Sequence, residues 1–137
     1  MREQRIWAYS PRLAWKNYQG KEQCRSEVQK KADELIAIFL KPQFIQPPPP
    51  HPKFNYIVDI FGKWRQHFFQ FSSRYACPGP NAISPYFETG FARLEWYAKD
   101  RFNLAYHRHT GQWLTVEHNL TLSECFEIIK NGPLFQP

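Results

Sequence analysis

The chain has 137 residues, a formal net charge of +6 at pH 7, and an aromatic content of 18%. This length suits one domain whose core needs neither a metal nor a disulfide. Its longest strongly apolar run, 35–40, is far shorter than the roughly 20 residues that span a bilayer. Three cysteines without CxxC spacing, after an N-terminus that lacks a secretory apolar region, predict a cytoplasmic protein with reduced thiols and no membrane partner.

Residues 1–21 are predicted to form a basic, aromatic N-terminal arm. Five basic residues against one glutamate give this segment a charge of +4, and two Trp and two Tyr rings lie among them. Such an arm can stack on bases while its cations neutralise phosphates. We favour packing of most rings over the domain, because exposed tryptophan is costly. The candidate binding residues of the arm are Arg2, Arg5, Trp7 and Arg12.

The remaining residues, 22–137, are expected to form one domain that begins with a helix near Ser26. The apolar side of this helix has helical spacing and contains Val28, Ala32, Leu35, Ile36, Phe39 and Leu40. Pro42 is expected to end the helix because proline lacks an amide donor. The proline-rich run 46–52 is predicted to be a stiff polyproline II spacer. The alternative is recognition of this run by an aromatic groove on another protein.

Strands are predicted at 56–60 and 64–76, joined by a turn at 61–63, and then at 91–98, 102–107 and 113–117. Alternation of apolar and polar residues places five side chains in the core: Leu94, Trp96, Leu104, Leu114 and Val116. Thr121 and Glu124 have the spacing of a capping box, and Gly132 follows the helix that they begin. The expected fold is α+β, with an antiparallel meander sheet of about five strands between an N-terminal and a C-terminal helix.

Three short runs carry a resemblance to a family of small bacterial proteins of unknown function, chiefly cyanobacterial. They are Tyr75-Ala-Cys-Pro-Gly-Pro-Asn-Ala82, Phe91-Ala-Arg-Leu-Glu95 and Arg108-His-Thr-Gly-Gln-Trp113. The resemblance covers roughly residues 55–137 and implies a bacterial cytoplasmic protein. It implies no activity, catalytic residue or cofactor.

Histidines and cysteines offer weak signals for chemistry. His107 and His109 would project from one face of a strand, and His118 or Cys77 could complete a zinc site. An exposed polar sheet edge explains the two histidines equally well, and we favour that interpretation. Cys77 precedes Pro-Gly-Pro, which is more typical of a turn than of a nucleophile. We therefore predict no metal ligand, no catalytic residue and no cofactor.

The face of the meander opposite the predicted core combines basic and aromatic side chains. It carries Arg93, Tyr97, His107 and Trp113. Such a surface suits protein recognition, where Tyr, Trp and Arg often anchor contacts, and it also suits stacking of single-stranded nucleic acid. Because the charge is modest and the rings are many, we favour a non-enzymatic adaptor or complex subunit with a protein partner or homo-oligomer. A single-stranded RNA- or DNA-binding module is the alternative, and a metal- or thiol-dependent enzyme is a weaker one.

Overall fold

The computed structural model describes residues 20–137, so the arm predicted for residues 1–21 lies almost wholly outside the described residues. The helices are α3 (Lys21–Leu35), the π-helical turn η1 (Ile36–Leu40), α4 (Lys41–Phe44), α5 (Leu122–Asn131) and the 3-10 turn η2 (Pro133–Phe135). The strands are β1 (Tyr56–Arg65), β2 (Phe68–Ala76), β3 (Tyr86–Ala98), β4 (Arg101–His107) and β5 (Trp113–Leu120).

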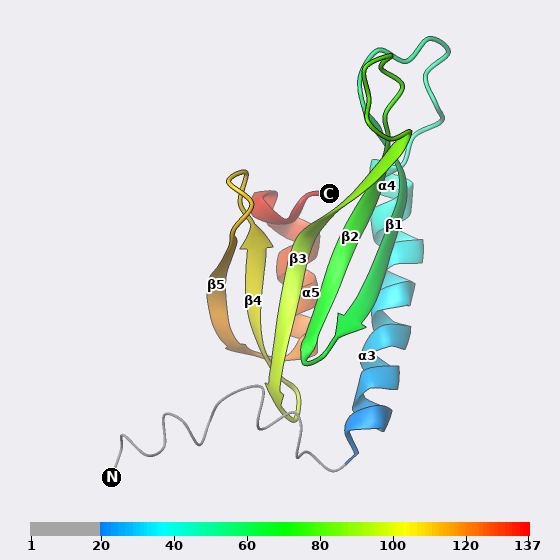
Figure 1. Cartoon of the computed structure of the whole chain (residues 1–137). Helices are drawn as coiled ribbons and strands as arrows, with labels where there is room; N and C mark the ends of the chain where they lie inside the picture. The colour runs from blue at the N-terminus through cyan, green and yellow to red at the C-terminus, as the bar shows by residue number, and fades with distance from the viewer. Residues whose placement is uncertain (1–19) are drawn as a thin grey trace.

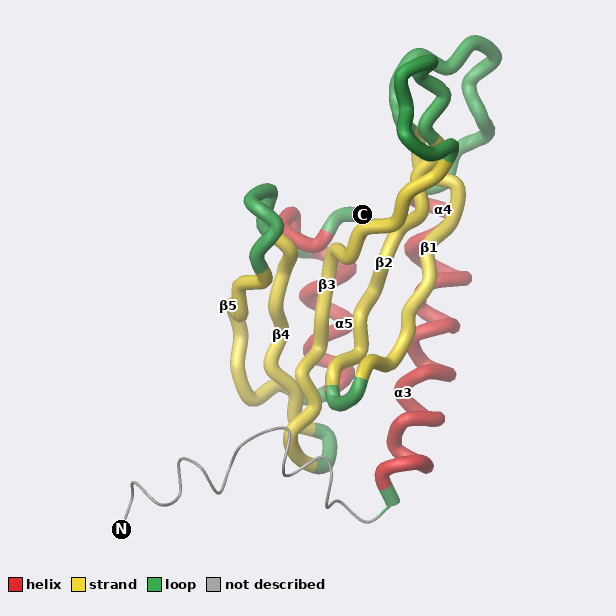
Figure 2. Tube along the Cα trace, viewed as in Figure 1, coloured by secondary structure: helices red, strands yellow, loops and turns green. Residues whose placement is uncertain are grey.

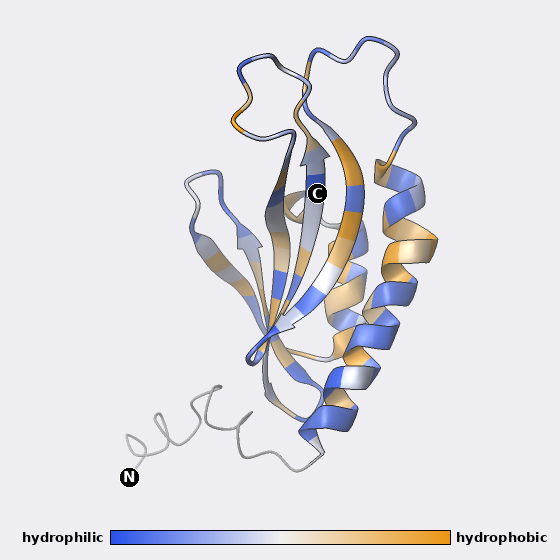
Figure 3. Cartoon of the chain, turned by 45° about the vertical axis from the view of Figure 1, so that its right-hand side comes forward, coloured by the Kyte–Doolittle hydropathy of each residue, from blue (hydrophilic) through white to orange (hydrophobic). Residues whose placement is uncertain are grey.

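The strands form one antiparallel sheet in the order β1-β2-β3-β4-β5, which confirms the predicted α+β fold. Helices α3 and α5 lie on the same side of this sheet, α3 behind β1 and α5 behind its middle (Figure 1). We call the side that carries neither of these helices the outer face. Both helices alternate between hydrophilic and hydrophobic residues along their length, as helices with one buried side do (Figure 3).

The core lies between the sheet and the two helices. Leu94, Trp96 and Leu104 are at most 1% exposed, which confirms three of the predicted core positions. The prediction for Leu114 was wrong, because this side chain is 41% exposed. Leu114 belongs to β5 and lies opposite Tyr106 of β4, and within residues 20–137 β5 is an edge strand that pairs only with β4. A neighbour on one side only gives an edge residue less cover than a central strand provides.

The helix does not end at Pro42, contrary to the prediction. The wider turn η1 precedes the proline, and the Lys41 N–H bonds to the carbonyl of Ile36, five residues earlier. Pro42 then falls in the first turn of α4, where a missing N–H leaves no helical bond unmade. Residues four apart in the chain shift gradually around a regular α-helix. The wide turn offsets this shift, and Ile36 and Leu40 are both buried.

The turn predicted at 61–63 was also placed wrongly. β1 continues to Arg65, and the chain turns at 66–67, where Gln66 has a φ of 55°. Gly62 instead lies within β1 beneath the ring of Phe69, and a Cβ there would be 2.6 Å from the Phe69 ring carbon Cζ. The glycine thus marks a close approach of a side chain to the backbone rather than a turn.

The C-terminal helix has the predicted cap. The Glu124 N–H donates to Thr121 Oγ1 at 3.2 Å, and the Thr121 N–H donates to Glu124 Oε1 at 2.8 Å.

The loops 45–55 and 77–85 project together beyond the helices at one end of the sheet (Figure 2). Between residues 20 and 137, no helix is long and apolar enough to span a membrane.

Candidate functional site

A continuous series of ring and guanidinium contacts crosses the outer face. The Arg93 guanidinium lies over the Phe68 ring at 4.4 Å and over the Trp113 ring at 4.6 Å. Trp113 in turn stacks with the His107 ring, with centroids 4.8 Å apart and an interplanar angle of 21°. We call Phe68, Arg93, Trp113 and His107 the stacked cluster. Its members come from β2, β3, β5 and β4, and all four are half-buried.

Small residues of the neighbouring strands make room for this cluster. A Cβ at Gly90 would lie 2.8 Å from Cζ2 of Trp113, so the indole can cross β4 towards β3 only because this position is glycine. Ala105 of β4 pairs with Arg93 of β3 and places only a methyl group beside the guanidinium. The His107 Nδ1–H donates to the Gly90 carbonyl at 3.1 Å, which orients the imidazole.

Arg93 is the permanently charged side chain of the cluster, and it is partly removed from water. Burial lowers the pKa of Arg93, while the charge of Glu95 raises it in part. The guanidinium nevertheless stays protonated, as arginine does in proteins. Its Nε–H is buried and has no acceptor among residues 20–137. The cluster therefore holds a permanent cation whose Nε–H has no acceptor within the described chain.

A second polar network runs across the outer face beside the cluster. His67, at the β1–β2 turn, places Nε2 3.1 Å from Glu95 Oε2, and Asn103 Nδ2 donates to Glu95 Oε1 at 3.3 Å. The Asn119 N–H donates to Asn103 Oδ1 at 3.1 Å, and the Tyr97 hydroxyl donates to Asn119 Oδ1 at 2.7 Å. These bonds fix polar side chains on β3, β4 and β5 in one arrangement.

Of the four sheet residues singled out from the sequence, the structure brings three together and separates the fourth. Arg93, His107 and Trp113 belong to the stacked cluster, whereas Tyr97 belongs to the polar network. Arg2, Arg5, Trp7 and Arg12 lie outside the described residues. Sequence reasoning missed Phe68 and Gly90 as parts of the site. Strand alternation places Phe68 on the face opposite the buried Phe69. The register of β2 against β3 pairs Phe68 with Glu95, so that its ring meets Arg93 diagonally.

The histidines and Cys77 do not converge. His109 lies in the exposed β4–β5 turn, while His107 is held by Trp113 and the Gly90 carbonyl. Cys77 begins the 77–85 loop, and its N–H donates to the Pro85 carbonyl at 2.8 Å. Among residues 20–137, no three His, Cys, Asp or Glu side chains are grouped so that they could hold a metal ion.

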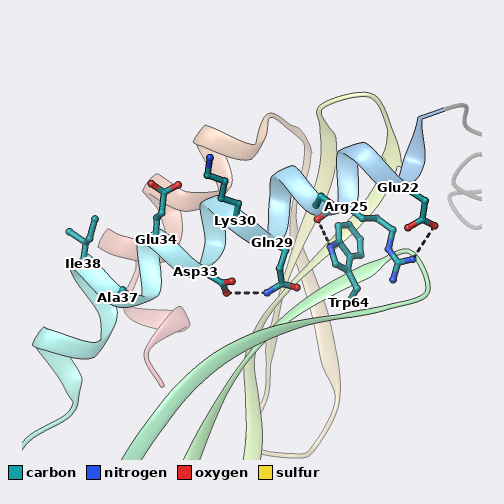
Figure 4. A pocket seen from close by; sticks show the side chains of 10 residues that line it. Glu22, Arg25, Gln29, Lys30, Asp33, Glu34, Ala37, Ile38 and Trp64 are labelled. Carbon is teal, nitrogen blue, oxygen red and sulfur yellow. Dashed lines mark hydrogen bonds and ion pairs between the residues drawn. The ribbon is translucent and has the colours of Figure 1, made fainter.

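A shallow groove runs along the exposed side of α3 beside Trp64 of β1 (Figure 4). Its polar groups mostly bond to each other or to the sheet. Trp64 Nε1–H donates to the Arg25 carbonyl at 3.0 Å, and Gln29 Nε2–H donates both to Asp33 Oδ1 and to the Gly62 carbonyl at 3.0 Å. The Gly62 contact covers part of the β1 edge, so these residues fasten α3 to the sheet.

Comparison with known proteins adds a family to these observations. No curated protein and no solved structure matches the chain. The profile of a family described as a domain of unknown function, DUF3024, matches residues 20–137, which are all of the residues that the structure describes. Because this match covers most of the chain, the chain belongs to the DUF3024 family.

Proposed function

We propose that the chain is a non-enzymatic adaptor or complex subunit whose outer face binds a protein partner. The observation that carries this proposal is the position of Arg93 between Phe68 and Trp113. An arginine held by two rings loses little freedom on binding, and partly buried Arg and Trp side chains are the residues that most often anchor protein interfaces. A carboxylate or carbonyl of the partner would accept hydrogen bonds from the terminal nitrogens of the Arg93 guanidinium.

The ring contacts favour a protein over a single-stranded nucleic acid. Phe68 has His67 at 4.1 Å and Arg93 at 4.4 Å, and Trp113 has Arg93 at 4.6 Å and His107 at 4.8 Å. A nucleobase needs a free ring face on which to stack. Phe68 and Trp113 each already have two such neighbours, which leaves less free ring face for a base to stack on. Nucleic-acid binding remains the alternative because of the net charge of +6.

The test compares Arg93→Gln and Trp113→Ala with Arg101→Gln, which removes an exposed arginine from the neighbouring strand β4. Each variant is first shown to keep the wild-type thermal midpoint and circular dichroism. Partners captured by the wild-type protein from its native cell are identified, purified and titrated against every variant. We expect Arg93→Gln to weaken binding by about 2 kcal/mol or more, roughly 30-fold in Kd, and Arg101→Gln to change it little.

A parallel titration with single-stranded oligonucleotides at several salt concentrations separates the two functions. Oligonucleotide binding that Trp113→Ala weakens, with a steep dependence on salt, would support the alternative. Equal affinity of wild type, Arg93→Gln and Trp113→Ala for every partner would refute the outer face as a binding surface.

Cys24, Cys77 and Cys125 are free thiols, which supports a reducing compartment such as the bacterial cytoplasm.

A further inference from the structure

The loop at 45–55 is the most unusual segment of the fold, and the outer-face proposal does not use it. Five of the seven residues from Gln46 to Pro52 are proline. Residues 46–51 are all exposed, and the loop projects beyond the helices instead of lying against them (Figure 2). Stable packing within the domain therefore does not explain this run.

The connection is also longer than its ends require. The Lys41 Nζ atom of α4 lies 3.2 Å from Asp59 Oδ1 of β1, so the helix and the strand that the loop joins are neighbours. Connections between a helix and an adjacent strand take about 2–6 residues in compact domains. Here the eleven residues 45–55 leave the body and return to it. A chain that had only to link α4 with β1 would not need this excursion.

The composition of the loop prepares it for one kind of binding. Each proline holds its own φ near −65°, and each residue before a proline is pushed out of the helical region. These restraints favour polyproline II geometry, which has no internal hydrogen bonds and leaves its carbonyls free to accept, and the chain bends at Pro50 and His51 within the run. No backbone hydrogen bond joins residues 46–52 to any other part of the described chain. Little conformational entropy is lost when such a segment binds.

Exposed apolar side chains lie on the same projecting end. Phe54, in the loop itself, is 82% exposed, and Ile83, in the neighbouring 77–85 loop, is completely exposed. Both loops line one shallow hollow, to which Lys53 and Ile83 contribute. These residues extend the surface that a partner could cover next to the proline run.

We propose that residues 46–52 are a docking peptide for a partner protein whose groove is lined by aromatic side chains. Such grooves accept a preformed polyproline II segment by packing rings against the proline faces and donating hydrogen bonds to its carbonyls. This surface is separate from the stacked cluster, so the inference does not depend on the outer-face proposal.

The test uses the full chain with Pro47, Pro48, Pro49 and Pro50 all replaced by alanine. The matched control is Pro78→Ala with Pro80→Ala, which removes two exposed prolines from the neighbouring loop. Proteins captured by wild type from its native cell are eluted with an oligoproline peptide, and a Gly-Ser peptide of equal length serves as the blank. Each protein that oligoproline releases is identified, purified and titrated against wild type, the four-alanine variant and the control.

We expect at least one such partner to bind the four-alanine variant 10-fold or more weakly, with the control close to wild type. Because the loop is exposed, the loop variants should stay folded at the assay temperature, with the far-UV circular dichroism of wild type. The proposal is overturned if oligoproline releases no captured protein, or if the four-alanine variant binds the released partners as wild type does. A further variant combines Phe54→Ala with Ile83→Ala. The proposal is also overturned if this variant abolishes binding while the four-alanine variant binds normally, since Phe54 and Ile83 would then be the docking element.

Discussion

Truncation of Leu104 to alanine tests the core against a control on the next strand. Leu104 is fully buried and pairs with the equally buried Leu94. Removing three side-chain carbons forfeits about 2.4 kcal/mol of transfer free energy at roughly 0.8 kcal/mol per carbon. The cavity left in a closed core adds to this loss, and the total cost of a buried Leu→Ala change is about 2–5 kcal/mol. We expect about 3 kcal/mol, because helices and sheet enclose the site on both sides.

Leu114→Ala is the matched control, because it removes the same three side-chain carbons from the neighbouring strand β5. Leu114 is 41% exposed, so water fills the vacated space and only the buried part of the transfer term is lost. Its expected cost is about 1 kcal/mol. With a urea slope of about 1.5–3 kcal/mol/M, Leu104→Ala should lower the unfolding midpoint by about 1–2 M. An unchanged midpoint and slope for Leu104→Ala, or a larger loss for Leu114→Ala, would refute this account of the core.

Three further outcomes follow from particular contacts. Gly62→Ala should lower the free energy of unfolding by about 1–3 kcal/mol, because its Cβ would be 2.6 Å from the Phe69 ring, whereas Gly79→Ala, with no atom within 4 Å, should leave the urea midpoint unchanged. Hydrogen bonds at the N-cap of α5 lower the pKa of Glu124 below 4.5, so their stabilisation is present above that pH and is lost as the pH falls. The thermal midpoint of Glu124→Gln should therefore decline less than that of wild type during acid titration, and parallel declines would contradict the cap. Burial raises the pKa of Cys125 to about 12, so mass spectrometry should find this thiol unlabelled by an alkylating reagent in the native protein and labelled after denaturation.

Local sequence patterns determined the elements whose stabilising contacts are close in the chain. The capping box of Thr121 and Glu124 and the apolar stripe of the following helix are three- and four-residue relationships, and the structure has both. Period-two alternation likewise placed Leu94, Trp96 and Leu104 in the core. These features need no knowledge of the partner strand, because backbone geometry alone decides which side chains share a face.

The tertiary structure decided what depends on contacts between distant segments. Gly62 resembles a turn residue until the ring of Phe69 is seen above it, and the turn lies instead at 66–67. Pro42 stays within the helical segment because the wide turn η1 precedes it, and no pattern in the sequence predicted that turn.

The same limit applies to the candidate site. Arg93, Trp113 and His107 could be assigned to one face from alternation, but their contact depends on the register of four strands and on the missing side chain of Gly90. Strand register is set by the packing of the whole sheet against α3 and α5, and a shift by one residue would reverse the faces. Sequence alone therefore determined which side chains could form a binding surface, and the folded sheet decided which of them touch.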